Sequence, residues 1–551
     1  MLCEGKLKMG KNVFMTILRV VFVLPVVNAA RPHIIFILAD DMGWNDFSFH
    51  GSDEIQTPNI DALAYSGVIL NQHYTQPICT PTRSALMTGR YPSNIGMQGS
   101  PLSAGEPRAL PRGKILPQYF KDLGYTTRIV GKWHLGYYKK EFTPTHRGFD
   151  SFLGYLNGFT SYYDHINQES ASGVVMEGLD FRRNSSAAWD LSGRYATDIF
   201  TEEAARIIRE HNPSIPLFLY LAHLASHAGN AGKLLEAPQE SVDMFSHIVE
   251  PNRRTYAAMV SKLDESVGRI VGALWTKGML ENSIIVFTSD NGAPSVDVVG
   301  YQNWGSNYPL RGLKTTQWEG GIRTPAVVWS PVLGRRVSDQ LMHVTDWLPT
   351  LISAAGGTLQ GVPLDGVDQW SALLEDTVSP RTEVLLQYDE VKGLYAARRE
   401  DWKITNGSNY GGEADDYYGH SGTDFANPPY NLTAVAHSVA GEAIASLLPS
   451  AIPDEEEMLL MRAESTVTCA LQADRTPCKP STTPNPCLFD VAVDPCETNN
   501  LALRHPEVLQ EMLDLVSKYK ATLIHQLNKP VDVNGSDPRK FNNTWSPWVD
   551  S

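Results

Sequence analysis

The sequence has few cysteines and few basic residues, and it lacks a long apolar run beyond its N-terminal segment. Six cysteines occur in 551 residues, and the formal net charge is −15. The acidic balance argues against nucleic acid as a partner, because phosphate backbones are bound by basic surfaces. We expect no stable membrane span, since a helix that crosses a bilayer needs about 20 consecutive apolar residues. Any anionic substrate would have to be held by a local basic cluster.

The N-terminal segment is typical of a secretory signal peptide. Basic residues precede a mostly apolar stretch over residues 13–27, and Val27-Asn28-Ala29 offers a small-residue cleavage site. Arg19 interrupts the apolar stretch, and a short signal anchor is the alternative. We expect residues 1–29 to be a signal peptide and the protein to enter the secretory pathway, with a lysosomal or extracellular destination. Five sequons are possible N-glycosylation sites on this route: Asn184, Asn406, Asn431, Asn534 and Asn542.

Four of the six cysteines cluster near the C-terminus, which is enough for two disulfides. Four cysteines allow three pairings, and we expect sequence neighbours to pair, as Cys469–Cys478 and Cys487–Cys496. A fifth cysteine belongs to the predicted signal peptide. Cys79 is then left without a partner in an oxidising compartment, where a spare thiol needs a reason.

The first two thirds of the chain alternate apolar runs with amphipathic patterns. Continuous apolar runs, which are typical of parallel strands buried on both faces, occur at residues 33–39, 217–222 and 284–288. Helical patterns lie between them at residues 58–66, 201–211 and 254–274. This alternation predicts a doubly wound α/β fold, with a large and mostly parallel sheet flanked by helices.

The pattern changes beyond about residue 385. Short strand-like pieces that predict an antiparallel meander occur at residues 384–388, 394–398 and 402–405. Residues 506–526 predict an amphipathic helix. We therefore expect a catalytic domain over residues 31–385 and a smaller C-terminal domain over residues 386–551, with an antiparallel sheet, a helix and the disulfides.

Polar side chains follow two of the predicted parallel strands where each strand ends. Asp40 and Asp41 follow the first run, and Asp290 and Asn291 follow the third. Ligands collect at the carboxyl ends of parallel strands, and carboxylate and amide oxygens suit Ca²⁺ better than a soft transition metal. Each pair alone is common in ordinary turns. Together with Cys79, they favour a site.

These residues belong to an ordered set of motifs by which the sequence resembles the sulfatase family. The motifs are Asp40-Asp41-x-Gly43-Trp44, Cys79-x-Pro81-x-Arg83, Gly131-Lys132-Trp133-His134, Arg147-Gly148-Phe149-Asp150, Ser289-Asp290-Asn291-Gly292, Arg311-Gly312-x-Lys314, Trp318-Glu319-Gly320-Gly321 and Cys487-Leu488-Phe489-Asp490. Their order and spacing match the family from about residue 31 to 500 and resemble its arylsulfatase B-like branch. The resemblance implies an alkaline-phosphatase-like sandwich and the hydrolysis of sulfate esters.

The resemblance also implies a cofactor made from the chain itself. Cys79 would be oxidised to Cα-formylglycine by the formylglycine-generating enzyme, and the hydrated aldehyde would be the nucleophile. One Ca²⁺ would be bound by position 79 together with Asp40, Asp41, Asp290 and Asn291. The other implied catalytic residues, which surround the sulfate with positive charge and proton carriers, are Arg83, Lys132, His134, His227 and Lys314. Of these, Lys132, His227 and Lys314 would contact the substrate.

The implied roles differ among these side chains. Arg83 lies four residues after Cys79 on the same helical face, where it can stabilise the hydrate, form a structural salt bridge to Asp40 or Asp41, or do both. His134 would accept the proton whose removal releases sulfate, and His227 would protonate the leaving alcohol. His227 lies in Ser-His-Ala-Gly rather than the His-x-Pro common in the family, and His223 is its nearby competitor.

Several functions are compatible with these residues. We expect a sulfatase that acts on N-acetylgalactosamine 4-sulfate or a related sulfated glycan. The alternative is a secreted sulfatase for small compounds such as aryl sulfates or glucosinolates. A phosphate-ester hydrolase on this fold would carry Ser or Thr at position 79, and a silent glycan-binding protein would have lost a metal carboxylate, a lysine or the cysteine.

The leaving group of the substrate would be recognised by loops. We expect these loops at residues 91–110, 156–185, 228–250 and 295–308. Tyr162, Tyr163 and Trp304 could line the site, or they could be ordinary core aromatics.

Overall fold

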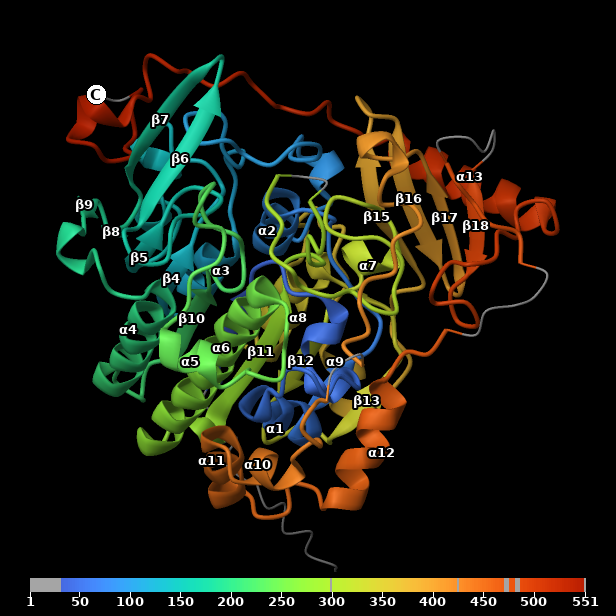
Figure 1. The fold of residues 1–551 in the computed structure, drawn as a ribbon, viewed down its shortest axis with the longest axis horizontal. Coiled ribbons are helices and arrows are strands. Elements are labelled where there is room, and N and C mark those ends of the chain that lie inside the picture. Colours follow the sequence, from blue (N-terminus) through green and yellow to red (C-terminus); the bar gives the residue numbers. More distant parts are fainter. Residues whose placement is uncertain (1–30, 298–299, 424–425, 470–474, 481–485, 550–551) are drawn as a thin grey trace, which may run out of the picture. The chain divides into compact units, whose positions relative to one another are not determined.

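The apolar run at residues 33–39 forms β1 (His33–Ala39), which lies inside a ten-stranded sheet (Figure 1). β1 pairs in parallel with β10 (Leu217–Ala222) on one side and with β11 (Ser283–Ser289) on the other. All three strands are buried along their whole length, as predicted for parallel strands covered on both faces. This computed structural model describes residues 31–297, 300–423, 426–469, 475–480 and 486–549. The predicted signal peptide lies outside the described residues.

The predicted large, mixed and mostly parallel sheet is confirmed. Its strand order is β13-β2-β12-β11-β1-β10-β4-β5-β8-β9. The strands from β11 to β5 are parallel, whereas β12 and β8 pair antiparallel at the two sides of this block. The remaining strands are β2 (Val68–Leu70), β4 (Thr126–Lys132), β5 (Ser151–Tyr155), β8 (Arg182–Arg183), β9 (Ser186–Ala187), β12 (Ala326–Trp329) and β13 (Arg336–Ser338).

Helices cover both faces of this sheet. Alternate residues of β1 point to opposite faces, so each face has a hydrophobic core of its own. Ile35 and Ile37 pack in a core with α1 (Pro58–Ser66), α4 (Ala196–Glu210) and α6 (Pro251–Thr276). Ile34 and Phe36 pack in a second core with helices on the other face, which are α2 (Cys79–Thr88), α3 (Leu116–Asp122) and α8 (Trp347–Ala354). Three short helices complete this part of the chain: α5 (Gln239–Asp243), α7 (Glu319–Ile322) and α9 (Trp370–Glu375).

The predicted helices exist, with shifted ends. The helix expected at residues 201–211 begins five residues earlier, in α4. The helix expected at 254–274 is longer at both ends, since Pro251 occupies its first turn and the Glu250 side chain accepts a hydrogen bond from the Arg253 N–H. Across the described residues, no helix combines the length and apolarity needed to cross a membrane.

The later part of the chain contains the predicted antiparallel meander. Its four-stranded sheet consists of β15 (Glu383–Asp389), β16 (Leu394–Arg399), β17 (Trp402–Asn406) and β18 (Cys487–Asp490). α13 packs against this sheet and spans Pro506–Lys520, so the helix predicted at 506–526 ends earlier. Two small two-stranded sheets pair β3 (His73–Tyr74) with β14 (Met342–His343), and β6 (Ile166–Ala171) with β7 (Val174–Leu179).

Segments after residue 385 also pack against the first sheet and its helices. α10 (Leu432–Ala436) and α11 (Val439–Leu447) share a core with α1 and α6, and α12 spans Glu455–Ser465. The C-terminal segment, red in Figure 1, lies beside β7, where Thr544 forms a bridge with Leu179. Residues Arg31–Ser551 thus form one compact unit. The division at residue 385 stays a prediction.

The predicted disulfide pairing is wrong. The structure pairs Cys469 with Cys496 and Cys478 with Cys487, with Cα–Cα distances of 5.9 and 6.1 Å. Cys487 begins β18 and is in register with Thr405 of β17. Its neighbours in space are therefore set by the register of the sheet rather than by closeness in sequence, and the two disulfides are nested.

Candidate active site

The carboxyl ends of three strands of one sheet bring the predicted metal and sulfate residues together. Asp40 and Asp41 follow β1, Asp290 and Asn291 follow β11, and Lys132 is the last residue of β4. All five side chains are buried. This confirms the expectation that residues from separate strand ends would be neighbours in space.

Arg83 reaches these strand ends from α2, which begins at Cys79. Its Nε and Nη2 atoms donate to Oδ2 of Asp290 over 3.1 and 2.8 Å, and Nη2 lies 3.7 Å from Oδ2 of Asp40. Of the two partners predicted for Arg83, Asp40 forms the longer ion pair, whereas the main partner is Asp290, which the sequence did not indicate. Because the guanidinium is fully buried, it is a fixed positive charge behind the carboxylates.

Each aspartate that follows β1 has its own lysine. Lys132 Nζ donates to Oδ2 of Asp40 over 2.7 Å, and Lys314 Nζ contacts both carboxylate oxygens of Asp41 over 2.6 and 2.5 Å. Burial and the charge of Asp290 raise the pKa of Asp40 well above its usual range, despite Lys132. Burial acts in the same direction on Asp41, but the charges of His227 and Lys314 outweigh it and lower the pKa of that carboxyl.

The oxygen atoms of this cluster fit a hard cation. Asp40 Oδ1 and Asn291 Oδ1 are buried and have no hydrogen-bond partner among the described residues. Buried acceptors without a partner are costly, and a set of carboxylate and amide oxygens is what Ca²⁺ prefers. His227 also lies close enough to share an ion with Asp40 and Asp41. Its imidazole nitrogen suits a transition metal better, so it is not part of the oxygen set.

His134 has a defined tautomer. Its Nε2 atom lies 2.9 Å from the carbonyl oxygen of Leu102, and its Nδ1 atom is buried without a hydrogen-bond partner in the part of the chain that the structure describes. Since a carbonyl can only accept, Nε2 carries the proton and Nδ1 keeps a free lone pair. Burial lowers the pKa of His134 well below its usual value. The neutral ring can therefore accept a proton at Nδ1.

The structure places His227, and not His223, in the cleft above Cys79. His227 Nδ1 donates to the carbonyl of Ala228 over 2.6 Å, and its Nε2 lies 3.2 Å from both Lys314 Nζ and Asp41 Oδ2. His223 points to the layer of α6, where its Nε2 lies 3.0 Å from Oγ of Ser266. The competitor named from the sequence is thus a core histidine.

The cleft is small, with a volume of about 190 Å³, and Cys79 lies in its wall. Cys79 is the one cysteine outside a disulfide in the described part of the chain, and burial raises the pKa of its thiol. The leaving-group side of the cleft is formed by side chains that the sequence did not single out, namely Phe159, Asn167, Glu169, Tyr301 and Tyr410. The ring of Phe159 stacks on that of His227, with centroids 5.7 Å apart.

The aromatic residues named from the sequence do not line this cleft. Tyr162 is fully buried and donates its hydroxyl to the carbonyl oxygens of Leu224 and His227. Tyr163 and Trp304 pack against the core. Phe159 and Tyr301 lie in loops that were expected to recognise the leaving group, whereas Tyr410 lies outside every one of them and had no signal in the sequence.

Comparison with known proteins gives consistent matches. The family model described as Sulfatase matches residues 32–357. The chain is 38% identical to Arylsulfatase J of Mus musculus over 543 residues, which covers 94% of this chain and 80% of the mouse protein. It is 32% identical to N-acetylgalactosamine-6-sulfatase of Rattus norvegicus over 377 residues, covering 64% and 67%. The crystal structure of Ps i-CgsB matches with a TM-score of 0.70 at 25% identity, covering 94% and 99%.

Proposed function

The chain belongs to the sulfatase family and is an enzyme that hydrolyses sulfate esters, and we propose that its nucleophile is a formylglycine made from Cys79. The observation that carries this is the position of Cys79. It begins α2 in the wall of a cleft that also contains Lys314, His134 and His227. A formylglycine hydrate would supply the hydroxyl that attacks sulfur. The partner that this requires during maturation is the formylglycine-generating enzyme.

We further propose that one Ca²⁺ is held by position 79 together with Asp40, Asp41, Asp290 and Asn291. The unpartnered oxygens of Asp40 and Asn291 support this set. When bound, the ion would polarise the sulfate and neutralise its charge. Arg83 would hold Asp290 and Asp40 in place from behind, because it donates to the one and lies close to the other.

The remaining side chains would bind the sulfate and move protons. Lys132 and Lys314 would stabilise charge on the sulfate oxygens, since both side chains are buried and their ammonium groups are held by Asp40 and Asp41. His227 would protonate the leaving alcohol from Nε2, the nitrogen that is not bound to the backbone. His134 would accept a proton at Nδ1, for which the described residues offer no hydrogen-bond partner.

The substrate that we propose is the sulfate ester of a neutral sugar, such as N-acetylgalactosamine 4-sulfate at the end of a glycan. Glu169 lines the leaving-group side, and burial raises its pKa to about 7. Among the described residues of the cleft wall, Lys314 and two histidines are the basic groups, and all three serve the sulfate. A carboxylate on the leaving group would therefore meet Glu169 without a compensating cation. This supports a neutral sugar next to the sulfate.

A second candidate is a small aryl sulfate or glucosinolate. The observation that favours it is the aromatic character of the cleft wall, where Phe159 and Tyr301 have ring centroids 5.1 Å apart. An aryl leaving group could stack there. Release of sulfate from a panel of sulfated sugars, aryl sulfates and glucosinolates separates the two candidates.

Mass spectrometry of the peptide that contains Cys79 tests the nucleophile. We expect an aldehyde in place of the thiol in an active preparation. An active preparation with an unmodified thiol would contradict the proposal.

The route through the secretory pathway also stays a proposal, to a lysosomal or an extracellular destination. The two disulfides support an oxidising compartment. Four of the five sequon asparagines are exposed, at positions 184, 431, 534 and 542, whereas Asn406 is half-buried and its side chain donates to the carbonyl of Gly393. We therefore expect glycans at the first four and little or none at Asn406.

A further inference from the structure

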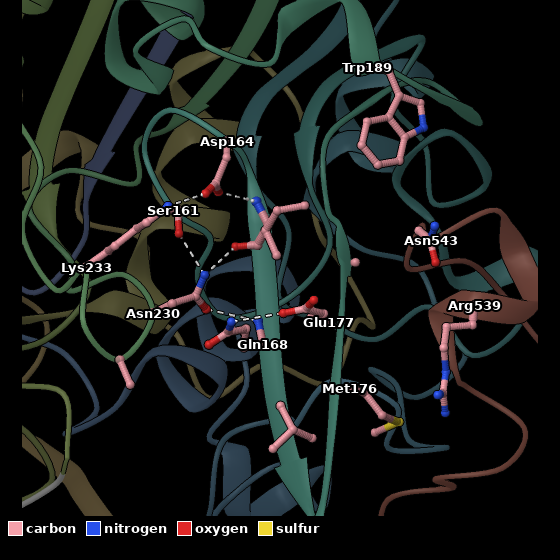
Figure 2. A pocket seen from close by; sticks show the side chains of 14 residues that line it. Ser161, Asp164, Gln168, Met176, Glu177, Trp189, Asn230, Lys233, Arg539 and Asn543 are labelled. Atoms are coloured by element: carbon pink, nitrogen blue, oxygen red, sulfur yellow. Dashed lines mark hydrogen bonds and ion pairs between the residues drawn. The ribbon is translucent and has the colours of Figure 1, made fainter.

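A second and larger hollow, drawn in Figure 2, is lined in part by strand β6. Its volume is about 780 Å³, which is in the range of ligand sites. Successive residues of β6 point in opposite directions. Asn167 and Glu169 line the cleft, whereas Ile166 and Gln168 line this hollow. We call the hollow the hairpin groove; its wall includes Ser161, Gln168, Glu177, Trp189, Asn230 and Arg539.

One wall of the hairpin groove is a connected row of polar side chains, which Figure 2 shows from Asp164 to Glu177. Asn230 Nδ2 donates to Oγ of Ser161 over 2.7 Å, and its Oδ1 accepts from the N–H of Gln168 over 2.9 Å. Gln168 Nε2 donates to Oε2 of Glu177 over 3.1 Å. Because these groups hold one another in place, a ligand would not have to order them.

The basic groups of the hairpin groove are neutralised by carboxylates. Lys233 Nζ lies 2.7 Å from Oδ2 of Asp164. Arg539 donates to Asp537, with Nη2 2.7 Å from Oδ2. Lys233 and Arg539 are the basic residues among the described residues that line the groove. The groove therefore offers many donors and acceptors but no excess positive charge, which favours an uncharged ligand over a polyanion.

Exposed apolar surface accompanies these polar groups. The side chains of Trp189 and Val175 are 44% and 64% exposed, and both line the groove. In Figure 2 the ring of Trp189 lies across the hairpin from the polar row, so the ring and the polar groups would contact different units of one oligosaccharide. Sugar units suit both, because they have hydroxyls around their edges and C–H groups on their faces.

The C-terminal segment completes the groove and is held firmly. Trp545 Nε1 donates to the carbonyl of Asn167 over 3.0 Å, and the N–H of Leu179 donates to the carbonyl of Asn543 over 2.8 Å. Asn543 and Arg539 lie on the other side of the hairpin from the polar row in Figure 2. The groove is therefore built from fixed elements on both sides.

We propose that the hairpin groove binds uncharged sugar units of an oligosaccharide. The inference extends the proposed function and rests on it in one respect: the glycan held in the groove would be the one whose sulfate is cleaved on the other side of β6. The groove would then raise affinity for long substrates without taking part in the chemistry.

Binding of unsulfated sugars tests the groove apart from catalysis. The probes are tetrasaccharides without sulfate or carboxylate, built from galactose, N-acetylgalactosamine or N-acetylglucosamine, and binding is measured by calorimetry. We expect at least one to bind the wild-type protein, and Trp189→Ala to weaken its binding about tenfold. Trp275→Ala is the matched control, because Trp275 is 39% exposed at the end of α6 and outside the groove. Gln168→Ala replaces Trp189→Ala if the latter fails to fold.

Absence of binding by every probe, or equal binding by Trp189→Ala and Trp275→Ala, would overturn the proposal. So would binding that appears only after enzymatic removal of N-linked glycans, because the groove would then hold a glycan of the chain itself, such as one on Asn542. If removal of the N-linked glycans leaves binding of the tetrasaccharide probe unchanged, the proposal is supported.

Turnover distinguishes failure of the groove from failure of the proposed function. For Trp189→Ala we expect an unchanged kcat/KM on a small aryl sulfate, and a KM about tenfold higher with an unchanged kcat on a sulfated tetrasaccharide. If Trp189→Ala turns over both substrates like the wild type, the proposed role of the groove is contradicted and the proposed function is not. A protein that binds the neutral probe through Trp189 but cleaves no sulfated sugar contradicts the proposed substrate alone.

Discussion

The Nζ atom of Lys314 lies 3.2 Å from Nε2 of His227, and both atoms contact the carboxylate of Asp41. Apart from burial, which is the largest influence on both groups, the ammonium group of Lys314 acts to lower the pKa of Asp41 and that of His227, the proposed general acid. Lys314→Ala removes a fixed positive charge from the position where the sulfate would lie. We expect kcat/KM on an aryl sulfate to fall about 10²–10³-fold. Lys518→Ala is the control, since this exposed lysine pairs with Glu383 far from the cleft, and a comparable loss in both variants would contradict the role of Lys314.

The two histidines after β10 have separate roles. His227→Ala removes the proposed acid from the cleft, so we expect kcat on an alkyl sulfate to fall about 10²–10⁴-fold. His223→Ala alters a core contact with Ser266, and we expect a lower Tm with near-normal kcat. Steady-state kinetics and thermal unfolding of both variants show which histidine acts in catalysis and which stabilises the core. A greater loss of kcat in His223→Ala would reverse the assignment.

Ca²⁺ should stabilise the folded protein as well as activate it. Its ligands exist as a set in the folded state, so an ion present at about 100 times its Kd would add about 2.7 kcal/mol to the free energy of unfolding. We expect chelation to lower the Tm of the wild type, and Asn291→Ala to abolish most of that shift. Asp376→Asn is the control, because this exposed carboxylate pairs with Arg336 on the surface. A Tm that is indifferent to Ca²⁺ would exclude the ion as a resident ligand.

Glu169 should make the discrimination between substrates depend on pH. Its pKa is raised to about 7 by burial, so the side chain is mostly neutral in acid and becomes charged as the pH rises through 7. For a sulfated sugar that carries a uronate, we expect KM to rise about fivefold from pH 5 to pH 8 because like charges then meet. Glu169→Gln should abolish this extra rise, and an aryl sulfate with an uncharged leaving group, measured in both enzymes, corrects for other titrations. A uronate substrate with the same pH dependence in both enzymes would contradict the role of Glu169.

The sequence predicted the part of the site that regular structure creates. Asp40 and Asp290 could be placed together because parallel strands end at one edge of a sheet, and Arg83 could be placed by its spacing from Cys79 along a helix. The backbone pattern alone fixes such neighbours.

The other parts of the site and the disulfides depend on segments whose sequences have no regular hydrophobic periodicity. Glu169 belongs to the two-stranded sheet of β6 and β7, apart from the ten-stranded sheet. Tyr410 lies in the segment between β17 and α10. The disulfides depend on the register between β17 and β18. A sequence pattern of apolar residues predicts neither the residues that line the cleft nor the disulfide pairing, because both depend on how segments distant in the sequence pack together.

Strand β6 separates two surfaces that share a backbone and no side chain. Substitutions at Asn167 and Glu169 should alter which leaving group the cleft accepts next to the sulfate. Substitutions at Ile166 and Gln168 should alter which sugar units the hairpin groove binds. The two preferences can therefore be varied independently. A single inserted residue within the strand would instead exchange them at once, because it turns each later side chain to the opposite face.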